Sequence, residues 1–199
     1  MSLEGKKIGL VLTGSFCTFE RVFHAAEELV RLGAEVTPIM SSNAASIKSR
    51  FGTPEEFIRR LVGITGRDVI KTIEDAEPIG PKKLFDLVAA APCTGNTLAK
   101  LAHGITDTPA TMAVKSHVRN GRPVLIAVST NDGLAAAAKN IGTLQNYRNF
   151  YFVPYRQDDA EGKPSSTVAH FAKLPEAADA ALQGRQLQPT LLAPKEKKK

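Results

Sequence analysis

The chain has 199 residues, of which 43% are hydrophobic and 23% charged, as in an ordinary globular protein. Half of its net charge of +6 lies in the last five residues, 195–199, and the rest is spread along the chain. Proteins that bind single-stranded nucleic acids interleave aromatic and basic residues, and this sequence lacks that pattern. A nucleic-acid partner is therefore not expected. No apolar run reaches the roughly 18 residues that would span a membrane, and no signal-peptide pattern opens the chain, so we expect a cytosolic protein.

The first half of the chain alternates strand and helix patterns. Residues 7–13 predict a buried strand, residues 18–32 an amphipathic helix that ends at Gly33, and residues 35–40 a second strand. Pro38 favours an edge position for that second strand, because proline cannot donate to a neighbouring strand on both sides. The run Thr53-Pro54-Glu55-Glu56 predicts a helix start with a capping box. A short strand is expected near residues 69–73.

The second half continues this alternation. Strands are predicted at residues 84–91, 123–129 and 149–154, and helices after Thr97, at residues 109–120, 134–144 and 175–183; residues 157–167 are predicted to be a polar loop. This order predicts an α/β protein: a three-layer, doubly wound parallel sheet, Rossmann-like or flavodoxin-like, with helices on both faces. We expect one domain over residues 1–185 and a basic tail over residues 186–199.

Small polar residues follow four of the predicted strands. In a parallel α/β sheet the ligand lies beyond the carboxyl ends of the strands, often at a helix N-terminus. The candidate cofactor-binding residues are therefore Thr13, Gly14 and Ser15; Ser41, Ser42 and Asn43; Pro92, Cys93, Thr94, Gly95, Asn96 and Thr97; and Asn131 after Ser129-Thr130. Serines at strand ends also serve simply as helix caps, and that alternative stays open.

Three absent patterns narrow the choice of cofactor. The first strand-to-helix turn lacks GxGxxG, the second strand ends without an acidic residue for an adenosine ribose, and the chain has no GxxxxGK[ST] loop. Dinucleotide and P-loop sites are therefore disfavoured. A mononucleotide held by amides and hydroxyls fits better, and FMN is the natural candidate.

These residues resemble the homo-oligomeric flavin-containing Cys decarboxylase family, whose members read PxSxNT and PxMN where this chain has PCTGNT and STN. The resemblance covers residues 6–173. It implies that Gly14, Ser15 and Ser41 or Ser42 lie near an FMN phosphate, and that Pro92, Thr94, Asn96 and Thr97 lie along the flavin. Asn131 would help to hold a substrate carboxylate. The family also implies a homo-oligomer, a trimer or a dodecamer.

Two departures bear on the reaction. The decarboxylases use a histidine after the second or third strand and a cysteine near the substrate, whereas this chain has no histidine between His24 and His103 and has cysteines only at positions 17 and 93. The resemblance therefore favours a branch that oxidises a small cyclic dicarboxylate together with a dehydrogenase-like partner subunit, on which NADP could take the electrons. Alternatives are a flavin-free scaffold subunit, an FMN-dependent decarboxylase and a prenyltransferase, although no acid matches Arg148 for the last.

A dicarboxylate substrate needs cations, and arginine suits planar carboxylates. Arg50, Arg148 and Arg156 flank predicted strand ends and are candidates, although each alone could be a solvated surface residue. Cys93 is interpreted as a small buried residue rather than a reactive thiol. The chain shows no histidine or cysteine spacing of a metal site, so no metal is expected. The sequence does not identify a catalytic base.

Overall fold

The structure, a computed structural model, describes residues 3–193. A seven-stranded sheet forms its centre, in the order β2-β1-β3-β4-β7-β6, with β5 paired to β4. The parallel strands are β1 (Lys7–Leu12), β2 (Glu35–Met40), β3 (Leu87–Cys93), β4 (Val124–Thr130) and β5 (Phe150–Phe152). The antiparallel strands are β6 (Tyr155–Asp159) and β7 (Lys163–Ala169). The sheet is therefore mixed.

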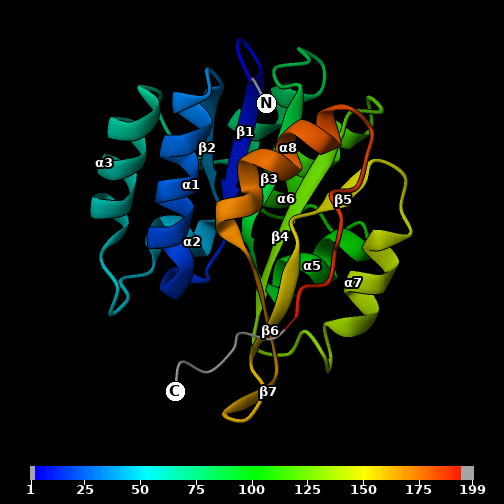
Figure 1. Cartoon of the computed structure of the whole chain (residues 1–199). Helices are drawn as coiled ribbons and strands as arrows, with labels where there is room; N and C mark the ends of the chain where they lie inside the picture. The colour runs from blue at the N-terminus through cyan, green and yellow to red at the C-terminus, as the bar shows by residue number, and fades with distance from the viewer. Residues whose placement is uncertain (1–2, 194–199) are drawn as a thin grey trace.

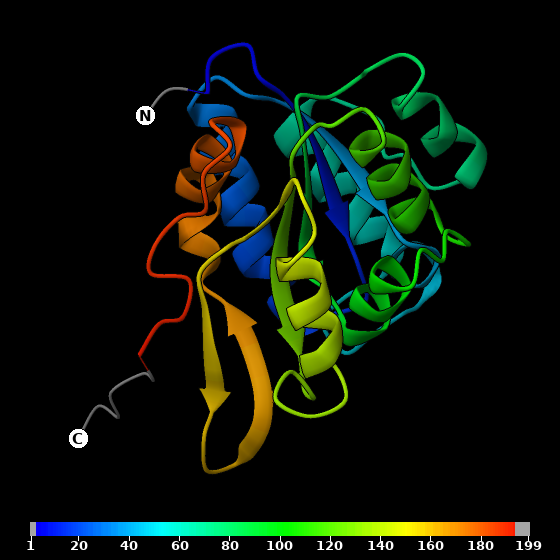
Figure 2. The same ribbon diagram turned by 90° about the vertical axis from the view of Figure 1, so that its right-hand side faces the viewer.

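Helices cover both faces of this sheet (Figures 1 and 2). One face carries α1 (Phe19–Arg31) and α8 (Leu174–Leu182), and the other carries α5 (Gly95–Ala102), α6 (Pro109–Val118) and α7 (Ala138–Gln145). The remaining helices are α2 (Ser42–Ser46), α3 (Pro54–Thr65), α4 (Ile73–Ala76) and the short turns η1 (Phe16–Thr18), η2 (Glu77–Ile79) and η3 (Phe171–Lys173). The predicted three-layer α/β fold with helices on both faces is confirmed, but the sheet is not wholly parallel as predicted, because β6 and β7 pair antiparallel.

The central strands follow from continuous apolar runs. All seven residues of β3 are buried, as are the first six of β4, because helices cover both faces of these strands. Strand β2 lies at the edge of the sheet, where Pro38 does not interrupt pairing on a second side. The predicted capping box also forms: the Thr53 hydroxyl accepts from the Glu56 amide at 3.3 Å, and the Glu56 carboxylate accepts from the Thr53 amide at 2.7 Å.

The predicted polar loop at residues 157–167 is wrong, because these residues belong to the β6–β7 hairpin. Its turn is closed by Asp159, whose carboxylate accepts from the amides of Glu161 and Gly162. The outer part of the hairpin extends beyond the helical layers (Figure 2), so its side chains are largely exposed and polar. Exposure on both sides removes the apolar alternation by which a strand is recognised.

Three other boundaries differ from the prediction. The strand expected at residues 69–73 is reduced to a single bridge between Ile70 and Ile39, and α4 begins at Ile73. Strand β3 continues through Pro92 to Cys93, after a cis peptide bond between Ala91 and Pro92. Helix α7 begins only at Ala138, since residues 131–137 form turns.

The chain past residue 185 packs on the edge of the fold as far as it is described. Gln186 exchanges side-chain hydrogen bonds with the backbone of Phe152, and the Tyr155 backbone bonds to Thr190 and Leu192. The basic residues predicted to form a tail, 195–199, lie outside the described residues. The single-domain boundary at residue 185 therefore stays a prediction.

Candidate functional site

A cleft of about 920 Å³ opens at the carboxyl ends of β1, β3 and β4. It is lined by residues 14–18, 21, 49–51, 94–96, 129–132, 158, 163 and 166–168. Three strand-end loops therefore meet here, together with the turn before α3 and the β6–β7 hairpin. We refer to this space as the cleft.

The cleft brings together seven of the residues predicted for a cofactor or substrate site. They are Gly14, Ser15, Arg50, Thr94, Gly95, Asn96 and Asn131. They come from segments up to 117 residues apart, so the predicted convergence of strand-end loops is what the fold produces. The donors in this group are hydroxyls and amides apart from the Arg50 guanidinium.

Four further predicted residues lie behind the cleft wall. Thr13, Pro92, Cys93 and Thr97 are each buried, with Thr13 only 1% exposed. The Thr13 hydroxyl donates to the Pro92 carbonyl at 2.8 Å and accepts from the Thr94 amide at 3.0 Å. It thereby ties the end of β1 to the end of β3. These residues position the wall rather than face a ligand.

The serines after β2 lie beside the cleft rather than among the residues that line it. Ser41 is the N-cap of α2, and its hydroxyl accepts from the Ala44 amide at 3.3 Å. Ser42 and Asn43 form the exposed first turn of that helix. A Cβ added to Gly14 would lie 3.9 Å from the Asn43 Cβ, so this turn still borders the first loop. The helix-cap alternative describes Ser41 in this structure.

Two of the predicted arginines lie elsewhere. Arg148 is exposed and precedes β5, at the opposite end of the parallel strands from the cleft. Arg156 lies on β6 and lines a second hollow, next to the cleft. Arg50 stacks its guanidinium over the Phe51 ring at 4.8 Å at the cleft. Of the three predicted arginines, Arg50 alone lines the cleft.

Hydrogen bonds between loops fix the hydroxyl groups of the cleft. Ser15 Oγ and Ser129 Oγ are 2.7 Å apart, which joins the loop after β1 to the end of β4. Thr94 Oγ1 accepts from the Thr97 amide at 3.4 Å, as the N-cap of α5. The wall is therefore held by side-chain bonds across three strands.

The first residues of α5, Gly95 and Asn96, line the cleft. The first backbone bond of this helix runs from the Leu98 amide to the Thr94 carbonyl, so helix geometry leaves the amides of Gly95 and Asn96 for an outside acceptor. Gly95 cannot carry a side chain here, since an added Cβ would be 2.7 Å from Thr130 Oγ1 and 2.8 Å from Asp132 Oδ1. Helix α5 thus approaches the loop after β4 closely.

Four charged residues of the cleft, unlike Arg50, were not predicted. Arg21 reaches it from α1, Asp132 from the turns after β4, and Asp158 and Lys163 from the hairpin, where their charged atoms are 3.8 Å apart. Asp132 also contacts the Thr130 hydroxyl. The position of Asp132 directly after Asn131 could have predicted it as a residue of the cleft. No signal in the sequence marks the hairpin pair, because the polar pattern of the hairpin predicts a loop.

The two cysteines differ in environment. Cys93 is fully buried, and burial raises the pKa of its thiol far above the ordinary value, as expected of an inert packing residue. Cys17 is exposed at the cleft, with its sulfur 3.9 Å from Ser15 Oγ. Within residues 3–193 no three histidine, cysteine or acidic side chains gather as metal ligands would. None of the helices described is long and apolar enough to cross a membrane.

The model of the family described as Flavoprotein matches residues 1–179. The chain belongs to the flavoprotein family. This flavoprotein is 46% identical over 191 residues to the B subunit of dipicolinate synthase from Bacillus subtilis (strain 168), with 96% of both chains covered. It is therefore a homologue of that protein. The family resemblance expected from the PCTGNT and STN segments is confirmed.

Solved structures agree with this assignment. The crystal structure of the B subunit of dipicolinate synthase from Bacillus halodurans C superposes with a TM-score of 0.89 at 41% identity, covering 97% of this flavoprotein and 99% of that chain. DmrB of Burkholderia xenovorans in complex with FMN superposes with a TM-score of 0.67 at 18% identity, covering 89% and 96% of the two chains. The second likeness shows a shared fold alone.

Proposed function

We propose that this protein binds FMN in the cleft and acts as the flavoprotein component of a two-subunit dipicolinate synthase. The observation that supports the cofactor is the set of hydroxyl and amide donors that three strand ends bring together, above all Ser15, Thr94, Asn96 and Asn131. Such donors suit a mononucleotide phosphate and a flavin ring better than a metal or a dinucleotide. Membership of the flavoprotein family supports the same cofactor.

The residues that would hold FMN are those whose polar groups face the cleft. Backbone amides near Gly14 and at the start of α5, with the Ser15 hydroxyl, would bind the phosphate. Gly14 has open space where a Cβ would be, with no atom nearer than 3.9 Å, so a ligand can approach its backbone. Asn96 and Asn131 would orient the flavin ring. Bound FMN would supply the acceptor for the two electrons lost when a dihydrodicarboxylate becomes aromatic.

The partner and the assembly are part of the proposal. The name of the related protein implies an A subunit, and we propose that this partner is dehydrogenase-like and could pass the electrons to NADP. The protein itself would form a trimer or a dodecamer and act in the mother cell of a sporulating bacterium. The cleft lies open in one chain, which fits a site completed by another chain.

A flavin-free scaffold is the second candidate, and one observation favours it. The Asp132 carboxylate lies against the start of α5, 2.8 Å from where a Gly95 Cβ would be, so negative charge already occupies the neighbourhood of the free amides. Such a carboxylate would repel a phosphate placed directly there. Direct measurement of FMN binding separates the two candidates.

Titrating the purified protein with FMN should quench flavin fluorescence saturably, whereas FAD and NADP should bind more weakly. Replacing Ser15 or Asn96 by alanine should raise the Kd for FMN about tenfold each, the effect of losing one good hydrogen bond to a charged or polar ligand group. Arg148→Gln serves as the control, because Arg148 is exposed and lies away from the cleft. Absence of quenching at tens of micromolar FMN, even with the partner protein added, would favour the scaffold.

A further inference from the structure

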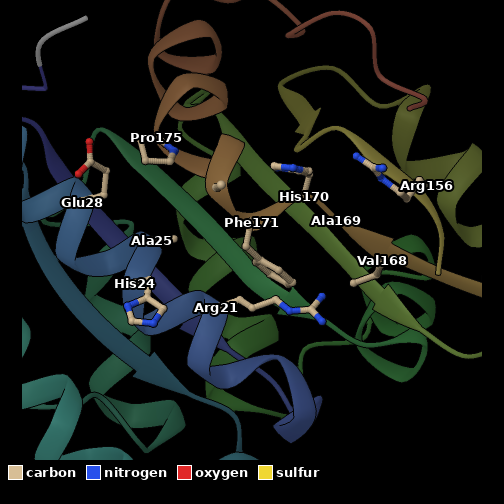
Figure 3. Close-up of a pocket in the computed structure, with 11 residues that line it drawn as sticks. Arg21, His24, Ala25, Glu28, Arg156, Val168, Ala169, His170, Phe171 and Pro175 are labelled. Carbon is tan, nitrogen blue, oxygen red and sulfur yellow. The ribbon is translucent and has the colours of Figure 1, made fainter. Parts of the chain in front are cut away.

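A second hollow of about 630 Å³ lies beside the cleft, between α1, the base of the hairpin and the start of α8 (Figure 3). It is lined by Arg21, His24, Ala25, Glu28, Arg156, Val168, Ala169, His170, Phe171, Ala172 and Pro175. Six of these eleven residues are small or apolar, and the other five are charged or polar. That composition and volume are typical of small-molecule sites, which span roughly 300–1,000 Å³.

The hollow joins the cleft. Arg21 and Val168 line both spaces, so a molecule in the hollow would be next to a ligand in the cleft. The strand register explains why Arg156 lines the hollow. Arg156 pairs with Val168 across the hairpin, and His170 is the diagonal neighbour of Arg156 on the same face. In Figure 3, Arg21 extends from α1 and Arg156 from β6, with residues 168–171 between them.

Two arginines of the hollow have no partner. The guanidinium groups of Arg21 and Arg156 make no hydrogen bond or ion pair with any residue in the range 3–193. The acidic residue of the hollow, Glu28, is already engaged, because the Arg31 guanidinium donates to both of its oxygens at 2.5 and 2.7 Å. This ion pair also lowers the pKa of the Glu28 carboxyl. The hollow is therefore left with uncompensated positive charge.

His24 does not change this balance. Its ring nitrogens face the carboxylates of Glu20 and Glu27 at 3.4 and 3.1 Å, on the exposed side of α1. Glu20 in turn accepts from Arg60 at 2.5 and 2.7 Å, away from the hollow. The carboxylates near α1 are thus paired with neighbours. The guanidiniums of Arg21, which is exposed, and of Arg156, which is half-buried, remain unpaired at the hollow and can attract an anion.

We propose that this hollow binds the small cyclic dicarboxylate substrate, with Arg21 and Arg156 as its carboxylate-binding residues. This inference rests on the proposed function and assigns its substrate to a space distinct from the FMN cleft. Two guanidiniums match two carboxylates, each able to donate two parallel hydrogen bonds. The apolar wall at Ala25, Val168 and Phe171 suits the ring between them. Val168 and Arg21 place that ring beside the cleft.

Calorimetric titration with dipicolinate, the product of the proposed reaction, tests the inference with and without saturating FMN. The protein should bind dipicolinate, and Arg21→Gln and Arg156→Gln should each raise its Kd about tenfold or more, the usual effect of losing a charge-assisted hydrogen bond. Picolinate, with one carboxylate, should bind the parent protein more weakly. Arg148→Gln removes the same charge from an exposed position outside the hollow and should bind dipicolinate like the parent.

A second variant tests the hollow without changing its charge. Ala172 is exposed on the wall of the hollow, so Ala172→Phe should fill part of the space without burying a polar group. This variant should weaken dipicolinate binding at least as much as either arginine variant while leaving the FMN Kd unchanged. Circular dichroism and thermal unfolding check that each variant is folded.

The outcomes separate the substrate site from the cofactor proposal. If dipicolinate binding needs Arg21 and Arg156 while FMN fails to bind, the hollow is supported as the dicarboxylate site and the flavin proposal is wrong. If FMN binds but dipicolinate does not, or binds equally well to all four variants, the hollow is not the substrate site and the flavin proposal survives. Equal affinity for picolinate and dipicolinate would also overturn the two-carboxylate assignment.

Discussion

Replacing Thr13 by valine should lower the free energy of unfolding by about 2 kcal/mol and weaken FMN binding about tenfold or more, although Thr13 does not line the cleft. The buried hydroxyl donates to the Pro92 carbonyl and accepts from the Thr94 amide. Valine keeps the shape but leaves that amide without an acceptor. Thr94 caps α5, so the loss would displace the start of the helix that borders the cleft.

The conservative variant distinguishes this positioning role from simple packing. Thr13→Ser keeps the hydroxyl and loses one buried methyl group, which costs roughly 1 kcal/mol of stability. It should nevertheless bind FMN like the parent. Urea unfolding and FMN titration of both variants give the comparison. FMN affinity that follows stability equally in the two variants, or that is unchanged in Thr13→Val, would contradict the positioning role.

The parallel part of the fold was predictable because burial leaves a direct signal. Strand β3 is buried along its whole length, and a strand covered on both faces appears as one apolar run. The carboxyl ends of such strands meet at one edge, so the convergence of Ser15, Asn96 and Asn131 on one cleft followed from their places after three strands. These inferences needed only local patterns and the rules of sheet topology.

The hairpin and the hollow could not be predicted in the same way. The ends of β6 and β7 next to the hairpin turn are exposed and polar, so this part of the sequence lacks the alternation of a half-buried strand. Without the hairpin, Arg156 has no known neighbours, and Arg21 looks like any exposed residue on an amphipathic helix. Their meeting depends on the antiparallel register that pairs Arg156 with Val168.

Ser41 shows the limit of assigning a role from a strand-end position. Hydroxyl residues after a strand serve equally as ligand donors and as helix caps, because both uses require an acceptor or donor at a helix N-terminus. Ser15 is held toward the cleft by Ser129, whereas Ser41 caps α2. The difference depends on which side chains from distant segments are near, and sequence spacing alone does not contain it.

Lowering the pH from 7 to 4 should destabilise the protein by about 3 kcal/mol through His117 alone. This side chain is buried in α6, 1% exposed, and burial lowers its pKa to about 4. Its Nε2 lies 3.0 Å from the Pro123 carbonyl and donates to it in the neutral form. Below the ordinary histidine pKa of 6.5, His117 binds a proton in the unfolded chain but stays neutral in the folded protein. The free energy of unfolding therefore falls as the pH falls toward 4.

The comparison that isolates this residue is His117→Gln, whose side-chain amide can still donate to the Pro123 carbonyl but does not titrate. Urea unfolding between pH 7 and pH 4 should give a smaller loss of stability for His117→Gln than for the parent, with the difference approaching about 3 kcal/mol at the lower pH. His103→Gln is the matched control, since His103 is exposed and forms no salt bridge with any of residues 3–193, so the stability of this variant should follow that of the parent across the pH range. Parallel pH curves for the parent and His117→Gln would show that His117 is not held neutral by burial, and the destabilisation would then belong to the carboxylates.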